Sequence, residues 1–461
     1  MVEQTLTREN IKYHAPLHDY QKIAVESVLF NGNKALFLEM GLGKTLATLE
    51  IIYQLKHKLV LIIAPKIIAD SVWGPEIEKW EYPFDYYRLA GSPAKRCRML
   101  NHAETGIFTM TPELVPWLCL NDYYKIFDMV VIDEITKFKN TKSKRWRALS
   151  KQVKQHPNIM RIGLTGTPSP NGLHELWGQL FILDNGKTLG KFKGKYLNAF
   201  FRDTSPEPRK FHQWRLLRGS EERILRRMRE CGIISMKANQ VLQQEDIINL
   251  PNLIIDMPAA ARKIYKELEV DLMATMPDGT LVLPEYETTI SIKMRQLSSG
   301  FMIDDDGVTH IIHWEKAKAL KEYLELVQGQ PQLIVFIYKA ESKMIQKILG
   351  PVPMLAGGTS AKLRQSYIES WNKGLLPAML VQPQAAGHGI NLQDGGHNIL
   401  FYSSDYNLET YQQVRARIHR QGQKETVFSR HMIGGSIENR IIQSLNRKAK
   451  QQDRLMTKLH T

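Results

Sequence analysis

The stretch LFLEMGLGKTLATL, residues 36–49, combines an apolar run, a glycine-rich turn and the start of a helical pattern. It predicts a strand, a phosphate-binding loop and a helix. Gly41 and Gly43 have no Cβ atom, so the backbone can curl with its N–H groups turned towards phosphate oxygens at the positive end of the helix. Lys44 would then reach the β- and γ-phosphates of a nucleotide, and Thr45 would hold Mg²⁺. The strict pattern G-x-x-x-x-G-K-[ST] fails at its first position, where Leu38 stands, so the rest of the chain has to decide.

Length and composition favour a soluble protein of two domains. The 461 residues are too many for one ordinary core, and 43% hydrophobic with 24% charged residues are typical of globular proteins. Lys and Arg outnumber Asp and Glu by 62 to 47, a net charge of +15. This charge favours a polyanionic partner such as nucleic acid, but a merely basic soluble protein fits it as well.

The sequence carries no disulfide, zinc or membrane signal. Its three cysteines, Cys97, Cys119 and Cys231, form no C-x-x-C pair. The longest apolar run, residues 59–64, is far too short to span a membrane, and the N-terminal residues lack the apolar core of a signal peptide. We therefore expect a cytoplasmic protein without a membrane partner.

Short β-branched runs alternate with helical patterns in both halves of the chain, which predicts parallel strands buried on both faces. The runs in the first half are residues 35–38, 59–64, 107–110, 129–132 and 162–164. Those in the second half are residues 253–256, 333–338, 378–382, 399–402 and 427–433. We expect an α/β protein with two parallel-sheet lobes in tandem.

The rhythm stops between the two halves. Residues 191–230 hold twelve Lys and Arg against five Asp and Glu, mostly in helix-like stretches such as EERILRRMRE. This predicts a basic helical insertion over residues 186–235. We place lobe 1 at residues 1–258 and lobe 2 at residues 259–461, where the chain ends in a basic helix that packs back on the body.

Carboxylates and hydroxyls follow two of the predicted strands. MVVIDE, residues 129–134, is a buried strand that ends in two carboxylates, at the edge where a parallel sheet presents its active site. Asp133 would order the Mg²⁺ shell, and Glu134 would position and polarise the attacking water. The stretch LTGTPSPNG, residues 164–172, adds the hydroxyls of Thr165 and Thr167. Taken alone, residues 129–134 could be a strand that ends in an acidic turn, and residues 164–172 could be a plain turn. Together with the phosphate loop, Asp133 and Glu134 indicate a catalytic site.

Three further stretches have a functional and a plain interpretation. Gln21, in LHDYQ, could read both the donor and the acceptor edge of adenine, or could simply lie on the surface. YQQVRARIHRQGQ, residues 411–423, puts Arg417 and Arg420 on one face if it is helical. Such a face is usually solvated, but in an ATPase it supplies arginine fingers that stabilise charge on the γ-phosphate. QAAGHGINL, residues 384–392, suits contact with a sugar–phosphate backbone and with the nucleotide.

The order of these pieces resembles the superfamily 2 helicase-like ATPases, and specifically the SWI/SNF-related group. The matching blocks are LHDYQ, EMGLGKT, IIAPKIIADSVW, DEIT, LTGTPSPNG, LIVFIYK, GGTSAKLRQSYIESWN, QAAGHGINL and QVRARIHRQGQ. Nine blocks in one order extend from Leu17 to Gln423. The phrases VIDEITKFKN, LHELWGQLFILDNG and ARIHRQGQ, with the small size, resemble the compact members encoded by phages and prophages.

The resemblance implies a motor of two RecA-like lobes that uses ATP and Mg²⁺ and lies across DNA. It implies these catalytic residues: Lys44, Asp133, Glu134, Arg417 and Arg420. It implies these nucleotide-binding residues: Gln21, Met40, Gly41, Leu42, Gly43, Lys44, Thr45, Leu46 and Gly389. Thr45 and Asp133 match the Mg²⁺ ligands. The implied elements that couple the cleft to DNA and to lobe movement include Thr165, Thr167, Gly387, Asn391 and Gln413.

One departure concerns coupling. Thr136 stands where the D-E-x-H box of this group often has a histidine, so hydrolysis is expected to survive while coupling to DNA is weaker or rerouted. The insertions are short relative to those of large chromatin remodellers, and no bromodomain-like, chromo-like or zinc module is visible. Nucleosome binding is therefore not suggested.

We expect a monomeric, DNA-stimulated ATPase that steps along duplex DNA in a bacterial or phage-infected cell, with replication or recombination proteins as further partners. Residues 137–147 and 209–229 are candidate phosphate contacts, or else solvated surface. A strand-separating helicase would share every ATPase residue but needs a wedge, for which residues 276–288 are the obvious candidate. A non-catalytic nucleic-acid-binding scaffold would be expected to lack Lys44, Glu134 or the arginines, and all are present.

Overall fold

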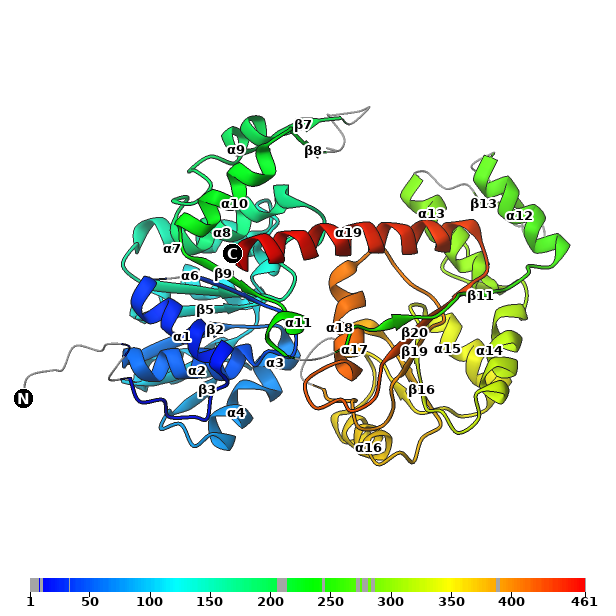
Figure 1. Cartoon of the computed structure of the whole chain (residues 1–461), viewed down its shortest axis with the longest axis horizontal. Coiled ribbons are helices and arrows are strands. Elements are labelled where there is room, and N and C mark those ends of the chain that lie inside the picture. The colour runs from blue at the N-terminus through cyan, green and yellow to red at the C-terminus, as the bar shows by residue number, and fades with distance from the viewer. Residues whose placement is uncertain are drawn as a thin grey trace, which may run out of the picture. The chain divides into compact units, whose positions relative to one another are not determined.

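The structure is a computed structural model, and it describes residues 8, 11–32, 34–204, 214–242, 245–270, 274–275, 281–282, 287–386 and 390–460. The chain divides into two compact units, which Figure 1 shows with their helices and strands. Unit 1 consists of Met1–Gln243 with Lys448–Thr461, and unit 2 of Gln244–Arg447. Each unit is built on a parallel sheet, which confirms the predicted α/β class with two parallel-sheet lobes.

The sheet of unit 1 has seven strands in the order β3-β4-β2-β5-β6-β1-β9, and every neighbouring pair is parallel. Their bounds are β1 (Ala35–Leu38), β2 (Leu59–Ile63), β3 (Tyr86–Arg88), β4 (Gly106–Met110), β5 (Met129–Asp133), β6 (Met160–Leu164) and β9 (Ile233–Met236). The five strands predicted from sequence are all present. β3 is short and only half-buried, and β9 begins inside the stretch predicted to be a helical insertion, residues 186–235.

Both faces of this sheet are covered by apolar packing, which explains why its strands read as continuous apolar runs. Leu36 and Leu38 of β1 belong to one core, whereas Ala35 and Phe37 belong to the core on the opposite face. Helices supply the other side of each core: α1 (Asp19–Asn31), α2 (Lys44–Leu55), α3 (Lys66–Ser71), α4 (Trp73–Lys79), α5 (Pro93–His102), α6 (Val115–Leu120), α7 (Lys144–Gln155), α8 (Leu176–Asp184), α9 (Lys193–Phe200), α10 (Ser220–Glu230) and α11 (Ala238–Val241). Ser92 and Ser143 cap the first turns of α5 and α7 through their hydroxyls.

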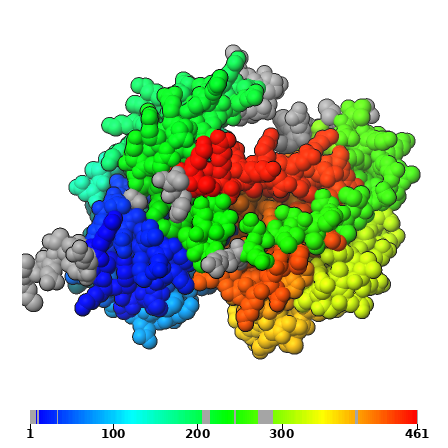
Figure 2. Space-filling view, in the orientation of Figure 1, coloured from blue at the N-terminus to red at the C-terminus, as the bar shows by residue number. Residues whose placement is uncertain are grey.

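The insertion predicted over residues 186–235 is not purely helical. Between α9 and α10 the chain forms an antiparallel pair, β7 (Phe201–Asp203) with β8 (Trp214–Leu216). The insertion ends in β9, which pairs in parallel with β1 and so completes the central sheet. α9 and α10 pack Tyr196, Phe200 and Ile224 into the core and leave their basic residues outward, and Figure 2 shows this green region as exposed surface.

The sheet of unit 2 has the order β10-β20-β19-β16-β18-β17, with β11 also paired to β20, and its pairs are parallel. Its strands are β10 (Ile248–Asn249), β11 (Leu253–Ile254), β16 (Gln332–Val335), β17 (Met354–Leu355), β18 (Ala378–Val381), β19 (Asn398–Phe401) and β20 (Phe428–Ile433). Two-stranded pairs are β12 (Ala274–Thr275) with β13 (Leu281–Val282), and β14 (Phe301–Ile303) with β15 (Thr309–Ile311). The helices are α12 (Ala259–Val270), α13 (Glu287–Ser298), α14 (Glu315–Leu326), α15 (Lys339–Leu349), α16 (Ala361–Asn372), α17 (Pro383–Ala386) and α18 (Leu408–Ile418).

The division between the units differs from the boundary after residue 258 that the sequence predicts. β10 and β11 precede that residue but pair with β20, so the hydrogen bonds of the second sheet draw them into unit 2. The last helix, α19 (Ser436–His460), also crosses the division. Its end belongs to unit 1, because Leu455, Met456 and Leu459 are buried in a core of that unit.

Candidate active site

The phosphate loop joins β1 to α2 in unit 1. Gly41 and Gly43 have positive φ angles of 88° and 66°, a conformation that glycine adopts without steric cost. A Cβ atom on Gly43 would lie 2.2 Å from Nε2 of Gln21, so a side chain there would displace the Gln21 carboxamide as well as strain the backbone. Leu38, which replaces the first glycine of the strict pattern, is the last residue of β1. The chain is still in a strand there and does not need glycine.

Lys44 is the first residue of α2 and turns back into the loop. Its Nζ donates to the carbonyl oxygens of Leu38 at 2.9 Å and Glu39 at 3.3 Å. Thr45 follows it and is half-buried. Leu42 and Leu46 are buried in the core, so only their backbone remains to meet a nucleotide. The loop therefore presents an ammonium, a hydroxyl and backbone N–H groups, as phosphate binding requires.

Asp133 ends β5 and is almost fully buried. One of its carboxylate oxygens, Oδ2, accepts a hydrogen bond from the indole Nε1 of Trp73 in α4 at 3.2 Å. Burial raises the pKa of Asp133 to about 6, while the Lys44 ammonium and the Trp73 hydrogen bond act in the opposite direction. The carboxylate thus has a fixed direction and a nearby cation, which suits a residue that orders a metal shell.

Glu134 takes a left-handed backbone conformation, with φ 68° and ψ 67°, which is uncommon for a residue other than glycine. Its Oε1 accepts hydrogen bonds from the hydroxyls of Thr136 at 2.8 Å and Thr165 at 2.5 Å. Thr136, which stands in the position where the related group often has histidine, therefore touches the carboxylate that is expected to activate water.

The turn that begins at Thr165 lies against the phosphate loop. A Cβ atom on Gly166 would come within 3.2 Å of Met40, and the carbonyl of Gly166 accepts a hydrogen bond from Gln452 of α19 at 3.4 Å. The backbone N–H of Thr167 donates to Oγ1 of Thr165 at 3.0 Å. The same hydroxyl thus contacts both Glu134 and the turn.

Gln21 lies in α1, buried against the phosphate loop. Its Oε1 accepts the backbone N–H of His18 at 3.0 Å, and its Nε2 donates to the carbonyl of Leu42 at 3.3 Å. The plain interpretation of Gln21 as a surface glutamine is therefore wrong, because only 3% of this residue is exposed.

Unit 1 brings these predicted residues together at the ends of three neighbouring strands, β5, β6 and β1. Thr45 and Asp133 offer a hydroxyl and a carboxylate, the hard oxygen donors that Mg²⁺ prefers. In the part of the chain that the structure describes, no three His, Cys, Asp or Glu residues cluster as metal ligands. These donors fit Mg²⁺ that is shared with substrate phosphates rather than enclosed by protein.

Unit 2 arranges the two arginines differently from the sequence expectation. α18 ends at Ile418, so Arg417 is helical while Arg420 lies in the bend beyond, and the two do not share a helical face. The Arg417 guanidinium is buried; its Nε donates to the carbonyl of Gln413 at 3.1 Å and its Nη1 to that of Ile390 at 3.2 Å. The pKa of Arg417 is lowered to about 10, mainly by burial and to a lesser extent by the positive charge of Arg420. Arg420 is half-buried.

The remaining predicted residues of unit 2 lie around the same helix. The Gln413 Nε2 donates to Glu409 at 3.3 Å, and the Asn391 Oδ1 accepts the backbone N–H of Gln393 at 3.3 Å. Gly387 and Gly389 lie outside the described residues. So do most of the candidate wedge, residues 276–288, and part of the basic stretch 209–229.

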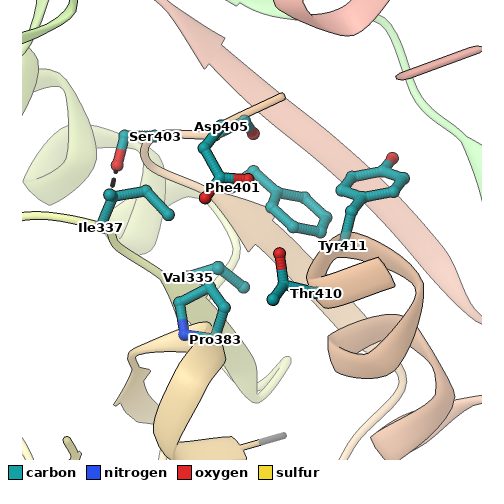
Figure 3. Close-up of a pocket in the computed structure, with 9 residues that line it drawn as sticks. Val335, Ile337, Pro383, Phe401, Ser403, Asp405, Thr410 and Tyr411 are labelled. Carbon is teal, nitrogen blue, oxygen red and sulfur yellow. Dashed lines mark hydrogen bonds between the residues drawn. The ribbon is translucent and has the colours of Figure 1, made fainter. Parts of the chain in front are cut away.

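A small pocket lies near the carboxyl ends of β16 and β19 (Figure 3). It is lined by Val335, Ile337, Phe401, Thr410 and Tyr411, among others, and Ser403 accepts the backbone N–H of Ile337 at 3.1 Å beside it. Its volume of about 10 Å³ holds one water molecule at most. It is too small to be a ligand site by itself.

Two residues near the site have no role in the sequence interpretation. Trp73 stands in the block IIAPKIIADSVW, and its indole is committed to Asp133. Glu50 is a carboxylate in the middle of the apolar face of α2, and none of it is exposed. A lone charge at a core position of a predicted helix was the available signal for Glu50.

Comparison with known proteins identifies the family to which the chain belongs. The model of the SNF2-related domain matches residues 20–304, and the model of the helicase conserved C-terminal domain matches residues 315–422. The chain is 28% identical to putative protein p41 of Acyrthosiphon pisum secondary endosymbiont phage 1, over 95% of this chain and 97% of that protein. It is also 24% identical to the putative ATP-dependent helicase/translocase YwqA of Bacillus subtilis. That alignment covers 100% of this chain but only 52% of YwqA.

Among solved structures, the Sulfolobus solfataricus SWI2/SNF2 ATPase core in complex with dsDNA aligns with a TM-score of 0.45 and 20% identity, over 98% of this chain and 96% of that chain.

In the described ranges, none of the helices combines the length and the apolar character that a membrane span requires.

Proposed function

The chain belongs to the SNF2-related domain family of helicase-like ATPases, and from this premise we propose that its ATP hydrolysis depends on DNA and moves the protein along a duplex. The observation that carries the proposal is the grouping of Lys44, Asp133 and Glu134 at the ends of neighbouring strands of unit 1. This is the place where an α/β sheet binds its ligand.

The residues of unit 1 divide the chemistry of hydrolysis among them. The Lys44 ammonium, already held inside the loop, would neutralise charge on the β- and γ-phosphates. Glu134 would orient the attacking water and draw a proton from it, and the Thr136 and Thr165 hydroxyls fix its carboxylate for that task. Thr45 and Asp133 would hold Mg²⁺, which supplies positive charge at the phosphates when it is bound.

The two arginines of unit 2 receive different roles in this proposal. Arg420 would stabilise the charge that develops on the γ-phosphate, as an arginine finger does. Arg417 would hold the backbone that carries Ile390 and Asn391, because its guanidinium is already bonded to the Ile390 carbonyl. Its own backbone carbonyl accepts the N–H of Leu392 at 3.1 Å, so the same residue fixes this loop twice.

Two basic surfaces of unit 1 support binding to a polyanion. Around α7, the side chains of Lys142, Lys144 and Arg147 are exposed. On α10, Arg223, Arg226 and Arg227 are exposed, while the apolar side of that helix is buried. Phosphate contacts of this kind give affinity that is electrostatic and falls with salt. The protein would act as a monomer in a bacterial or phage-infected cell, a setting that the phage relative supports.

The test is ATP hydrolysis by the purified chain, alone and with duplex DNA, single-stranded DNA or RNA, with E134Q as the inactive control. We expect strong stimulation by duplex DNA and little by RNA. A preference for single strands or forks, with displacement of a strand from forked DNA, would replace the translocase by a strand-separating helicase. Hydrolysis that no nucleic acid stimulates would contradict the dependence on DNA.

A further inference from the structure

Glu50 is a fully buried carboxylate that the hydrolytic chemistry does not use. It lies in α2, the helix that begins with Lys44 and Thr45 at the phosphate loop. The contacts of its carboxylate among the described residues are hydrogen bonds from four neutral donors. Burial of an unpaired carboxylate is costly unless its oxygens are satisfied. The partners of Glu50 therefore show what the charge holds in place.

Four donors converge on Glu50 and saturate its two oxygens. Oε1 accepts the backbone N–H of His14 at 3.0 Å and the Nε2 of Gln54 at 2.7 Å. Oε2 accepts the backbone N–H of Ala15 at 3.3 Å and the hydroxyl of Tyr82 at 2.6 Å. Two of these donors, the backbone N–H groups of His14 and Ala15, belong to the segment that leads into α1.

The same segment is fixed by neighbouring side chains of the same region. Gln54, one turn further along α2, also donates to the carbonyl of Lys12 at 2.8 Å. The His14 ring packs against the rings of Tyr53 and Tyr82, with centroids 4.8 and 4.6 Å away, and those two rings also contact each other. Residues 12–15 are thus attached to the second half of the helix that begins at the phosphate loop.

The segment continues directly into the residue expected to read the base. Leu17 is buried, and His18 is the N-cap residue of α1. The backbone N–H of His18 donates to the Gln21 carboxamide at 3.0 Å. The other end of that carboxamide donates to Leu42 in the phosphate loop. Gln21 therefore has two supports, one from the loop itself and one from the segment that Glu50 holds.

We propose that Glu50 is a positioning residue for base recognition: it sets the position of Gln21 relative to the phosphate loop and so gives the nucleotide site its preference for adenine over guanine. The inference rests on the proposed nucleotide site and extends it from phosphate binding to base selectivity. A purely structural carboxylate would lower stability when changed, but would leave the ratio of adenine to guanine binding as it was.

The experiment measures ADP and GDP binding by isothermal titration, because binding does not require hydrolysis. In E50Q the amide can accept only at one atom, so backbone donors lose partners, and we expect ADP to bind about tenfold more weakly with GDP affinity unchanged. Q21A should abolish the preference for ADP. Adding E50Q to Q21A should then change neither affinity, since Glu50 acts through Gln21.

The matched control is D184N. Asp184 also lies in unit 1 and accepts backbone N–H groups, those of Gly186, Lys187 and Thr188, but it contacts neither Gln21 nor the phosphate loop. It should lower the melting temperature without changing the ADP to GDP ratio. If E50Q does not fold, Y82F removes one donor and should weaken ADP binding about twofold to threefold.

Equal affinity of the wild type for ADP and GDP would overturn the proposal. So would parallel losses for both nucleotides in E50Q, or losses that add in E50Q with Q21A. Absence of ATP hydrolysis beside a retained, Glu50-dependent preference for ADP would instead refute the ATPase and leave this inference standing.

Discussion

The two candidate carboxylates of unit 1 and the buried arginine of unit 2 are held by different means. In unit 1 other side chains hold the carboxylates: Trp73 donates to Asp133, and two threonine hydroxyls donate to Glu134. In unit 2 the backbone holds the Arg417 side chain, which donates to the carbonyls of Gln413 and Ile390. The candidate carboxylates of unit 1 thus keep their directions through neighbouring side chains, whereas the direction of Arg417 in unit 2 depends on the path of the backbone around it.

The largest effect is expected from the residue on which the unit 1 network converges. E134Q keeps the shape but loses the carboxylate that would take a proton from water, so kcat should fall about 1,000-fold. ATP binding should change little, because Glu134 is not expected to bind the phosphates. Single-turnover hydrolysis and nucleotide binding separate the two effects. Near-normal turnover in E134Q would break the assignment of unit 1 as the hydrolytic site.

The next effect distinguishes the two arginines of unit 2. R420A should lower DNA-stimulated turnover about 100-fold with little loss of ATP binding, as expected for a finger that acts in the transition state. R417A should instead lower stability by about 3 kcal/mol, since it leaves buried carbonyls without their donor. Turnover and thermal unfolding should be measured on both variants. If R417A unfolds normally and R420A turns over normally, the division of roles is wrong.

The bonds around the unit 1 carboxylates should each matter less than the carboxylates themselves. W73F and T165V remove one hydrogen bond to Asp133 and Glu134 respectively, and each should lower kcat about tenfold, with folding retained. T136S keeps a hydroxyl and serves as the control that stays near wild type. Unchanged turnover in both variants would show that the carboxylates need no such support.

The smallest effect is a pH dependence confined to unit 2. His431 is buried against the Phe401 ring, and its ring nitrogens contact the hydroxyls of Tyr411 and Ser404. Its pKa is lowered to about 3, mainly by burial and further by the charges of Arg415 and Lys316. The folded pKa lies below the unfolded one near 6.5, so protons bind the unfolded chain preferentially as the pH falls below that value. Unfolding of unit 2 should become easier by about 2 kcal/mol at pH 5 relative to pH 7.

H431Q should remove this part of the pH dependence, which urea unfolding between pH 5 and pH 7 can measure. A slope that survives in H431Q would assign it to other groups. Little change between pH 7 and pH 8 is expected from His431 in either protein, because both states are then neutral at this position.

Much of the fold could be predicted because buried parallel strands are continuous apolar runs. All five predicted strands of unit 1 are present. In unit 2, β11, β18 and β20 fall within their predicted ranges, and β16 and β19 overlap theirs. β3 and β17 carried too little apolar character over too few residues to stand out. β9 was not predicted, because it directly follows a charged helical stretch. Its pairing with β1 joins residues far apart in the chain, so no local sequence pattern could indicate it.

Some features of the candidate site could likewise be predicted from the sequence, and others could not. The types and spacing of Lys44, Asp133 and Glu134 followed from the sequence, because the chemistry of phosphate transfer restricts which side chains can serve and where a strand must end. The position of Arg420 beyond α18 did not follow, because a helix end is set by what packs around it as much as by its own residues.

By itself, then, the sequence determined the two parallel-sheet lobes, the phosphate loop and the identity of the acidic pair, since these depend on local pattern and residue chemistry. Only the tertiary structure decided that Trp73 holds Asp133, that Thr165 reaches Glu134 and that Glu50 holds the segment before Gln21. These partners are separated by roughly thirty to sixty residues along the chain and meet only when the sheet is formed. A hydrogen bond depends on atomic distance, which residue order does not contain.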